Sequence, residues 1–78
     1  MLSIVIPALQ TQLDVIASLQ LRMDELCRVC ALWVEEQNQG RFLAERAHLL
    51  VRSRTNSVMG NKTLGQYRVE NNECFYLF

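Results

Sequence analysis

The sequence predicts a mainly α-helical fold with a small β element, an α+β class in which two helices form an antiparallel hairpin. Three observations predict it. Apolar residues recur with helical spacing over residues 7–38, a helix stop follows at residues 38–40, and residues 66–78 are rich in aromatic side chains. A chain of 78 residues favours one domain, so we expect a single domain over residues 1–78.

The predicted long helix, residues 7–38, begins at Pro7, which suits a first helical turn because its missing N–H is unpaired there anyway. Projected at 100° per residue, its apolar side chains cover an arc of roughly 160°, wider than the stripe that one neighbouring helix covers. The arc consists of Leu9, Leu13, Ile16, Leu19, Met23, Leu26, Cys27, Cys30, Trp33 and Val34. We therefore expect a homodimer, with Leu9, Ile16, Met23 and Cys30 as the candidate dimer interface.

A second, shorter helix is expected over residues 41–55. Leu43, Ala47 and Leu50 fall on its inner face. Asn38 and Gly40 supply the stop between the helices, because glycine readily adopts the left-handed conformation that ends a helix. The connection is short, and short connections join helices that lie antiparallel.

Both ends of the chain favour β structure. Residues 1–6 form an apolar, β-branched run that Pro7 stops, which favours a strand over an apolar arm laid on a neighbour. Residues 56–65 contain two glycines and predict a loop. Residues 66–78 predict a β-hairpin that turns at residues 70–72. The apolar residues at its end either join the core, where they could lie beside the first strand, or form a docking peptide for another molecule.

The composition excludes several classes of protein. Half of the residues are apolar, which excludes a disordered chain, and eight basic residues balance eight acidic ones. The charges are unevenly placed: residues 1–40 carry two basic against five acidic residues, a net −3, and residues 41–78 carry six against three, a net +3. We expect no membrane span and no secretory signal, and three cysteines favour reduced thiols, so we predict a cytoplasmic protein.

The pair Cys27 and Cys30 is the most motif-like feature. On a helix the two thiols share one face, and folding could bring His48 and Cys74 to them as metal ligands. However, no second close pair of ligands follows, and both cysteines fall within the apolar arc, so we interpret them as core residues. We find no nucleophile with an adjacent base and no paired carboxylates. The sequence thus predicts a protein that is not an enzyme and has no cofactor, no metal site and no catalytic residues.

We therefore expect a small non-enzymatic regulatory or adaptor protein that binds another protein through its apolar helix faces, as a homodimer. The alternative is nucleic-acid binding by residues 41–62, where five basic residues against one acidic residue give a net +4. Its candidate contacts with the phosphate backbone are Arg46, Arg52, Arg54 and Lys62. No aromatic platform or DNA-reading motif accompanies this charge, which favours the interpretation as a protein-interaction protein.

Overall fold

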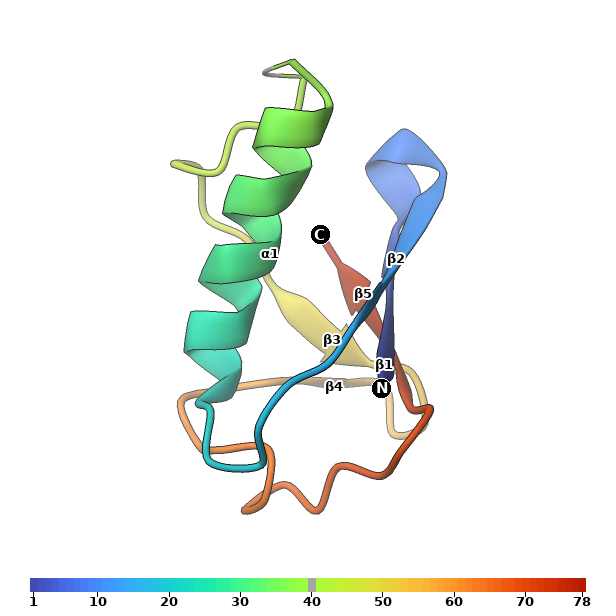
Figure 1. Cartoon of the computed structure of the whole chain (residues 1–78), viewed down its shortest axis with the longest axis vertical. Coiled ribbons are helices and arrows are strands. Elements are labelled where there is room, and N and C mark those ends of the chain that lie inside the picture. Colours follow the sequence, from blue (N-terminus) through green and yellow to red (C-terminus); the bar gives the residue numbers. More distant parts are fainter. Residues whose placement is uncertain (40) are drawn as a thin grey trace.

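The computed structural model describes residues 1–39 and 41–78, and in them one α-helix packs against a five-stranded mixed sheet (Figure 1). Across the sheet the strands follow the order β2-β1-β5-β3-β4. β1 and β5 are parallel, and the other neighbouring pairs are antiparallel. In chain order the elements are β1 (Leu2–Ile6), the 3-10 turn η1 (Pro7–Leu9), β2 (Thr11–Val15), α1 (Met23–Gln37), β3 (Leu50–Arg52), β4 (Ser57–Val58) and β5 (Cys74–Leu77).

The core lies between α1 and the sheet face turned toward it. Successive side chains of a strand point to opposite faces, and alternate residues of β1, β3 and β5 are accordingly buried. The buried apolar strand residues are Leu2, Ile4, Ile6, Leu50, Phe75 and Leu77, and α1 adds Met23, Leu26, Cys30, Ala31 and Val34. Each large apolar side chain buried in this way contributes about 1.5–3 kcal/mol, so this layer supplies most of the force that folds the domain.

Polar side chains lie at both ends of α1. Asp24 and Glu25 stand in its first turn, where carboxylates interact favourably with the helix dipole. At the other end the Asn38 side-chain amide donates a hydrogen bond to the Val34 carbonyl, 2.8 Å away. The segment after β4, orange in Figure 1, passes the start of the helix, and there the Met23 N–H donates to the Lys62 carbonyl at 2.9 Å.

The predicted helical hairpin is wrong. Residues 7–22 are not helical, since the chain makes the η1 turn, reverses at Gln10 with a left-handed φ of 51°, and returns as β2 along β1. Polar and apolar side chains alternate over residues 12–15, which is the period of a strand. The same residues also fit the longer helical pattern, because Leu13 falls on its apolar arc. Pairing with β1 decides between the two periods.

The second helix, predicted over residues 41–55, is also absent. Residues 41–49 are irregular, and Leu50 begins β3, which turns through Asn56 (φ 55°) into β4. β3 forms because β5 offers it an antiparallel partner, a contact between distant parts of the chain that outweighs local helix propensity. The helix stop was assigned partly to Gly40, which lies outside the described residues.

The predictions for the two ends of the chain are correct in part. Residues 2–6 do form a strand, and β5 is a strand inside the predicted hairpin 66–78. The hairpin itself is wrong, because residues 67–69 form no strand and β5 pairs instead with β1 and β3. Phe75 and Leu77 are fully buried, so these two residues of the final apolar run belong to the core, in the strand beside β1.

Candidate protein-interaction site

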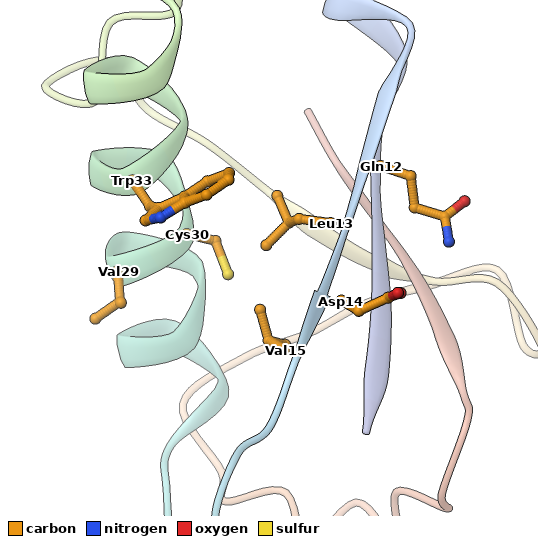
Figure 2. Close-up of a pocket in the computed structure, with 7 residues that line it drawn as sticks. All are labelled: Gln12, Leu13, Asp14, Val15, Val29, Cys30 and Trp33. Atoms are coloured by element: carbon orange, nitrogen blue, oxygen red, sulfur yellow. The ribbon is translucent and has the colours of Figure 1, made fainter.

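An apolar groove of about 440 Å³ lies between α1 and β2. We call it the β2–α1 groove; its lining residues are Gln12, Leu13, Asp14, Val15, Val29, Cys30 and Trp33. Figure 2 shows the Trp33 ring and the Leu13 side chain facing each other across it, with the Cys30 thiol between the two elements and Val15 below Leu13. The side chains of Gln12 and Asp14 point away from the helix, so the side chains that face each other across the groove are apolar.

The groove is open because β2 is the outermost strand on its side of the sheet. Leu13 and Val15 face the helix side, as their β1 partners Ile4 and Leu2 do, but they are only partly buried whereas those partners are at most 5% exposed. On the helix, Trp33 remains 48% exposed. A large apolar side chain left half in water beside other apolar groups is typical of a surface that another molecule covers.

The same strand offers unpaired backbone groups. Within the described residues β2 pairs only with β1, so the N–H and C=O groups along its other edge are free to bind an added strand. Proteins usually protect such an edge with lysine, proline, a bulge or a covering segment. Thr11–Val15 contains neither lysine nor proline, and Asp14 is its single charged residue. The opposite edge of the sheet, β4, is only two residues long and offers little to pair with.

The helix that forms one wall of the groove is acidic. α1 carries four carboxylates against one basic residue, a net −3. Glu36, which is exposed, follows Trp33 by three residues and therefore stands about one turn further along the same side. Glu25 is engaged by Arg28, whose guanidinium lies 2.8 Å from its carboxylate. A segment entering the groove would meet apolar side chains first and negative charge at the margin.

The residues predicted as a dimer interface are dispersed. Met23 is fully buried and Cys30 is 2% exposed, so both serve the core, although Cys30 also reaches the groove. Ile16 is 89% exposed just after β2, and Leu9 is half-buried in η1. The structure does not gather these four residues on one surface. The residues that it does gather include Leu13 and Trp33, which were predicted only as members of the apolar arc.

The predicted nucleic-acid contacts are also separated. Arg52 is buried, where its guanidinium pairs with the Glu73 carboxylate and donates to the carbonyl oxygens of residues 67 and 68. Hydrogen bonding from Arg52 is the main reason that the pKa of Glu73 is lowered. Arg54 lies 3.3 Å from Glu70 in an ion pair. Arg46 and Lys62 are exposed, but they come from different irregular segments.

The cysteines and His48 show no arrangement suited to metal chemistry. Burial raises the pKa of Cys30 to about 11 and, with the charge of Asp24 as a second cause, also raises that of Cys27, so both thiols are protonated at neutral pH. The ring nitrogens of His48 lie 3.0 and 2.7 Å from the carbonyl oxygens of Phe78 and Leu43. Residues 1–39 and 41–78 contain no group of three or more His, Cys, Asp or Glu side chains that could hold a metal ion.

A second apolar area lies on the sheet face opposite α1. Leu49, Val58 and Phe78 are each more than half exposed, and Val51 and Tyr76 lie half-buried among the strands. Leu49 and Phe78 exchange backbone hydrogen bonds of 3.0 and 2.9 Å, which extends the β3–β5 ladder by one pair. The strand edge beside this area is that of β4, which is two residues long, whereas the groove lies along the five-residue β2.

The chain matches no known family model and no curated protein. In the part of the chain that the structure describes, α1 is too short and too polar to cross a membrane, and it is the sole α-helix there. The assignment of the candidate site therefore depends on the geometry of the structure. The sequence pattern that could have indicated this site is the alternation of polar and apolar residues at 12–15, which predicts a strand with one apolar face.

Proposed function

We propose that the protein is a small non-enzymatic regulatory or adaptor protein that binds an extended segment of another protein chain in the β2–α1 groove. The observation that carries this proposal is the juxtaposition of a free strand edge and an apolar groove along the same strand. In such binding, backbone hydrogen bonds to the edge supply affinity, and alternate side chains of the added strand enter pockets that supply specificity.

The geometry and charge of the groove define the chemistry of the segment. β2 has five residues, which match an added strand of about 17 Å at roughly 3.4 Å per residue. Every second side chain of that strand would face Leu13 and Trp33 and should be apolar. The net −3 of α1 favours lysine or arginine at the flanks of the segment. We further propose a cytoplasmic location, which the three free cysteines support.

Selection from a library of random peptides displayed on phage tests the proposal. We expect enriched peptides to carry apolar residues at alternate positions and a basic flank. Fluorescence anisotropy of a labelled, selected peptide should show that Trp33→Ala weakens binding about 30-fold, the value for losing a central aromatic anchor worth roughly 2 kcal/mol.

Val58→Ala is the matched control, because Val58 is also about half exposed but lies on β4, at the opposite edge. This variant should bind the peptide as the parent protein does. Failure to enrich any peptide, or equal losses in the two variants, would contradict the binding of segments of other proteins in this groove.

Nucleic-acid binding remains the alternative function, with less support. Of its four candidate residues, Arg52 is occupied inside the protein and Arg54 has an acidic partner, which leaves Arg46 and Lys62 with exposed charges. Two separated cations give a weak attraction for a phosphate backbone compared with the 6–10 contacts of typical DNA-binding proteins.

A further inference from the structure

We infer that a second copy of this chain supplies a strand to the β2–α1 groove, so that β2 pairs antiparallel with β2 of the other copy and joins the two five-stranded sheets. The inference rests on the proposed function in one respect, that the edge of β2 accepts a strand. As the added strand, β2 supplies the alternate apolar side chains Leu13 and Val15, but not the basic flank expected of a segment from another protein. The inference goes further by naming the occupant, the register and the symmetry of the pairing.

The sequence of β2 is suited to pairing with itself. In this arrangement a two-fold axis passes between Leu13 and Leu13 of the second copy, so that the two leucines lie opposite each other. Gln12 then lies opposite Asp14 of the second copy. This register forms an apolar contact at the axis and two symmetric Gln–Asp pairs, in which the amide can donate to the carboxylate. A shift that centres the axis on Asp14 would oppose two carboxylates directly and is disfavoured.

Symmetry also fixes where the helices lie. Two antiparallel strands related by a two-fold axis share one sheet plane and keep the same face on the same side. Both copies of α1 therefore lie over one face of the joined sheet, with their grooves turned toward each other. Trp33, which is 48% exposed in the single chain and faces Leu13 in Figure 2, would then help to cover Leu13 and Val15 across the axis.

The size of the chain favours such an arrangement. A domain of 78 residues buries only about 60% of the surface that its unfolded chain exposes, and oligomerisation is a common way to add to that burial. Pairing through β2 would remove the five-residue free edge and the open groove in one contact. It would leave the apolar outer face of the sheet, around Tyr76 and Phe78, on the opposite side.

Sedimentation equilibrium of the full chain tests the inference. We expect association, with increasing concentration, from 9.0 kDa to twice that mass. The emission of Trp33, the single tryptophan, should shift to shorter wavelength over the same concentration range as water leaves the groove. If the protein stays monomeric at all concentrations up to about 1 mM, the inference is overturned. A dimer with a Kd above that value would be stabilised by less than about 4 kcal/mol.

Charge changes at Gln12 test the register. Gln12 is exposed, so the fold should tolerate them. Gln12→Lys would face Asp14 of the second copy and should tighten the dimer, whereas Gln12→Asp would face the same carboxylate and weaken it. Each change acts at two symmetric pairs, which predicts an effect of about 2- to 30-fold on the dimer Kd at low salt, in opposite directions.

The same two substitutions at exposed Ser57, on β4, serve as the control and should leave the Kd unchanged. Changes at Gln12 that leave the Kd unaltered, or that shift it in one direction for both charges, would overturn β2 pairing. A monomeric protein that still binds selected peptides through Trp33 would overturn self-pairing alone. A dimer with the predicted charge response but no peptide binding would support self-pairing and remove the wider partner function.

Discussion

The buried ion pair between Arg52 and Glu73 gives the sharpest prediction of stability. The two side chains are only 7% and 6% exposed, and the guanidinium Nη2 donates to the second carboxylate oxygen at 3.0 Å in addition to the contact from Nε. The guanidinium also donates to the carbonyls of Tyr67 and Arg68, at 2.9 and 3.2 Å. This pair therefore ties β3 to the irregular segment that leads into β5.

Glu73→Gln keeps the size of the side chain but leaves the Arg52 charge buried without its counterion. Removing one partner of a buried ion pair costs about 3–5 kcal/mol. A domain of 78 residues has a total stability of roughly 4–12 kcal/mol, so this one change should remove a large part of it. At about 4 °C or more per kcal/mol for a domain of this size, Tm should fall by at least about 12 °C.

Urea unfolding followed by circular dichroism measures the loss. Arg54→Ala is the control. Arg54 is half exposed, pairs with exposed Glu70 at 3.3 Å and reaches Glu73 only at 3.7 Å, so its loss should cost at most about 1 kcal/mol. Replacing both partners, Arg52→Met with Glu73→Leu, should restore most of the stability, since no charge then remains buried. A loss below about 1 kcal/mol for Glu73→Gln would refute the argument, because the pair would then behave as a solvated surface bridge.

Three further predictions concern pH, thiol reactivity and nucleic acid. Hydrogen bonding from Arg52 lowers the folded-state pKa of Glu73. The stabilisation that the ionised Glu73 gives is therefore present above the unfolded-state pKa of about 4.3 and is lost as the pH falls through the folded-state pKa. Thermal melts from pH 7 to 3 should show this loss of stability, and Glu73→Gln should reduce its dependence on pH. Cys30, with its raised pKa and 2% exposure, should react with iodoacetamide at pH 8 more slowly than Cys27, as followed by peptide mass spectrometry; faster labelling of Cys30 would contradict its burial. Gel shifts at two salt concentrations should show little DNA or RNA binding and no change for Arg46→Ala with Lys62→Ala, whereas tight, salt-sensitive binding that these changes weaken would favour the alternative function.

Local patterns predicted some elements of this fold. The runs at residues 1–6 and 74–78 are apolar and short, and the flanking Pro7 marks where the first one ends, so a strand could be predicted there. The helical pattern is correct for Met23–Gln37, and Asn38 does cap that helix. Where a pattern is long, consistent in period and properly ended, the local signal agrees with the final structure.

The errors arose where one sequence satisfied two patterns. Leu13 fits an apolar helical arc, yet with Val15 it also forms the inner face of a strand, and no local rule ranks these alternatives. The reversal at Gln10 uses a residue that rarely adopts a left-handed φ, so it carries no turn signal. The formation of β3 depends on pairing with β5, which lies more than twenty residues later in the chain. Patterns within a short stretch of sequence do not include that partner.

The apolar side chains of residues 7–38 predicted more apolar surface than one neighbouring helix covers. We attributed this surface to a homodimer interface, whereas the structure gives it another cause. The extra apolar residues served a sheet as well as a helix, so Met23 and Cys30 face the core while Trp33 and Leu13 face the groove. Likewise Arg52 was predicted, with Arg46 and Arg54, as a contact with the phosphate backbone, whereas the alternation of β3 turns it inward beside Glu73. Assigning the site therefore required the strand register.

The open groove itself follows from the dimensions of the two layers. A helix with its side chains is about 10–12 Å across, and five strands spaced about 4.8 Å apart place the outer strands roughly 19 Å from each other. One helix cannot cover that width, and irregular segments complete the core with Phe42 and Leu64. In the part of the chain that the structure describes, Leu13 and Val15 of β2 receive no such cover and stay partly exposed. A strand added to β2 would extend the sheet yet also bring its own side chains over this gap, which is why an added strand fits this surface better than a second helix.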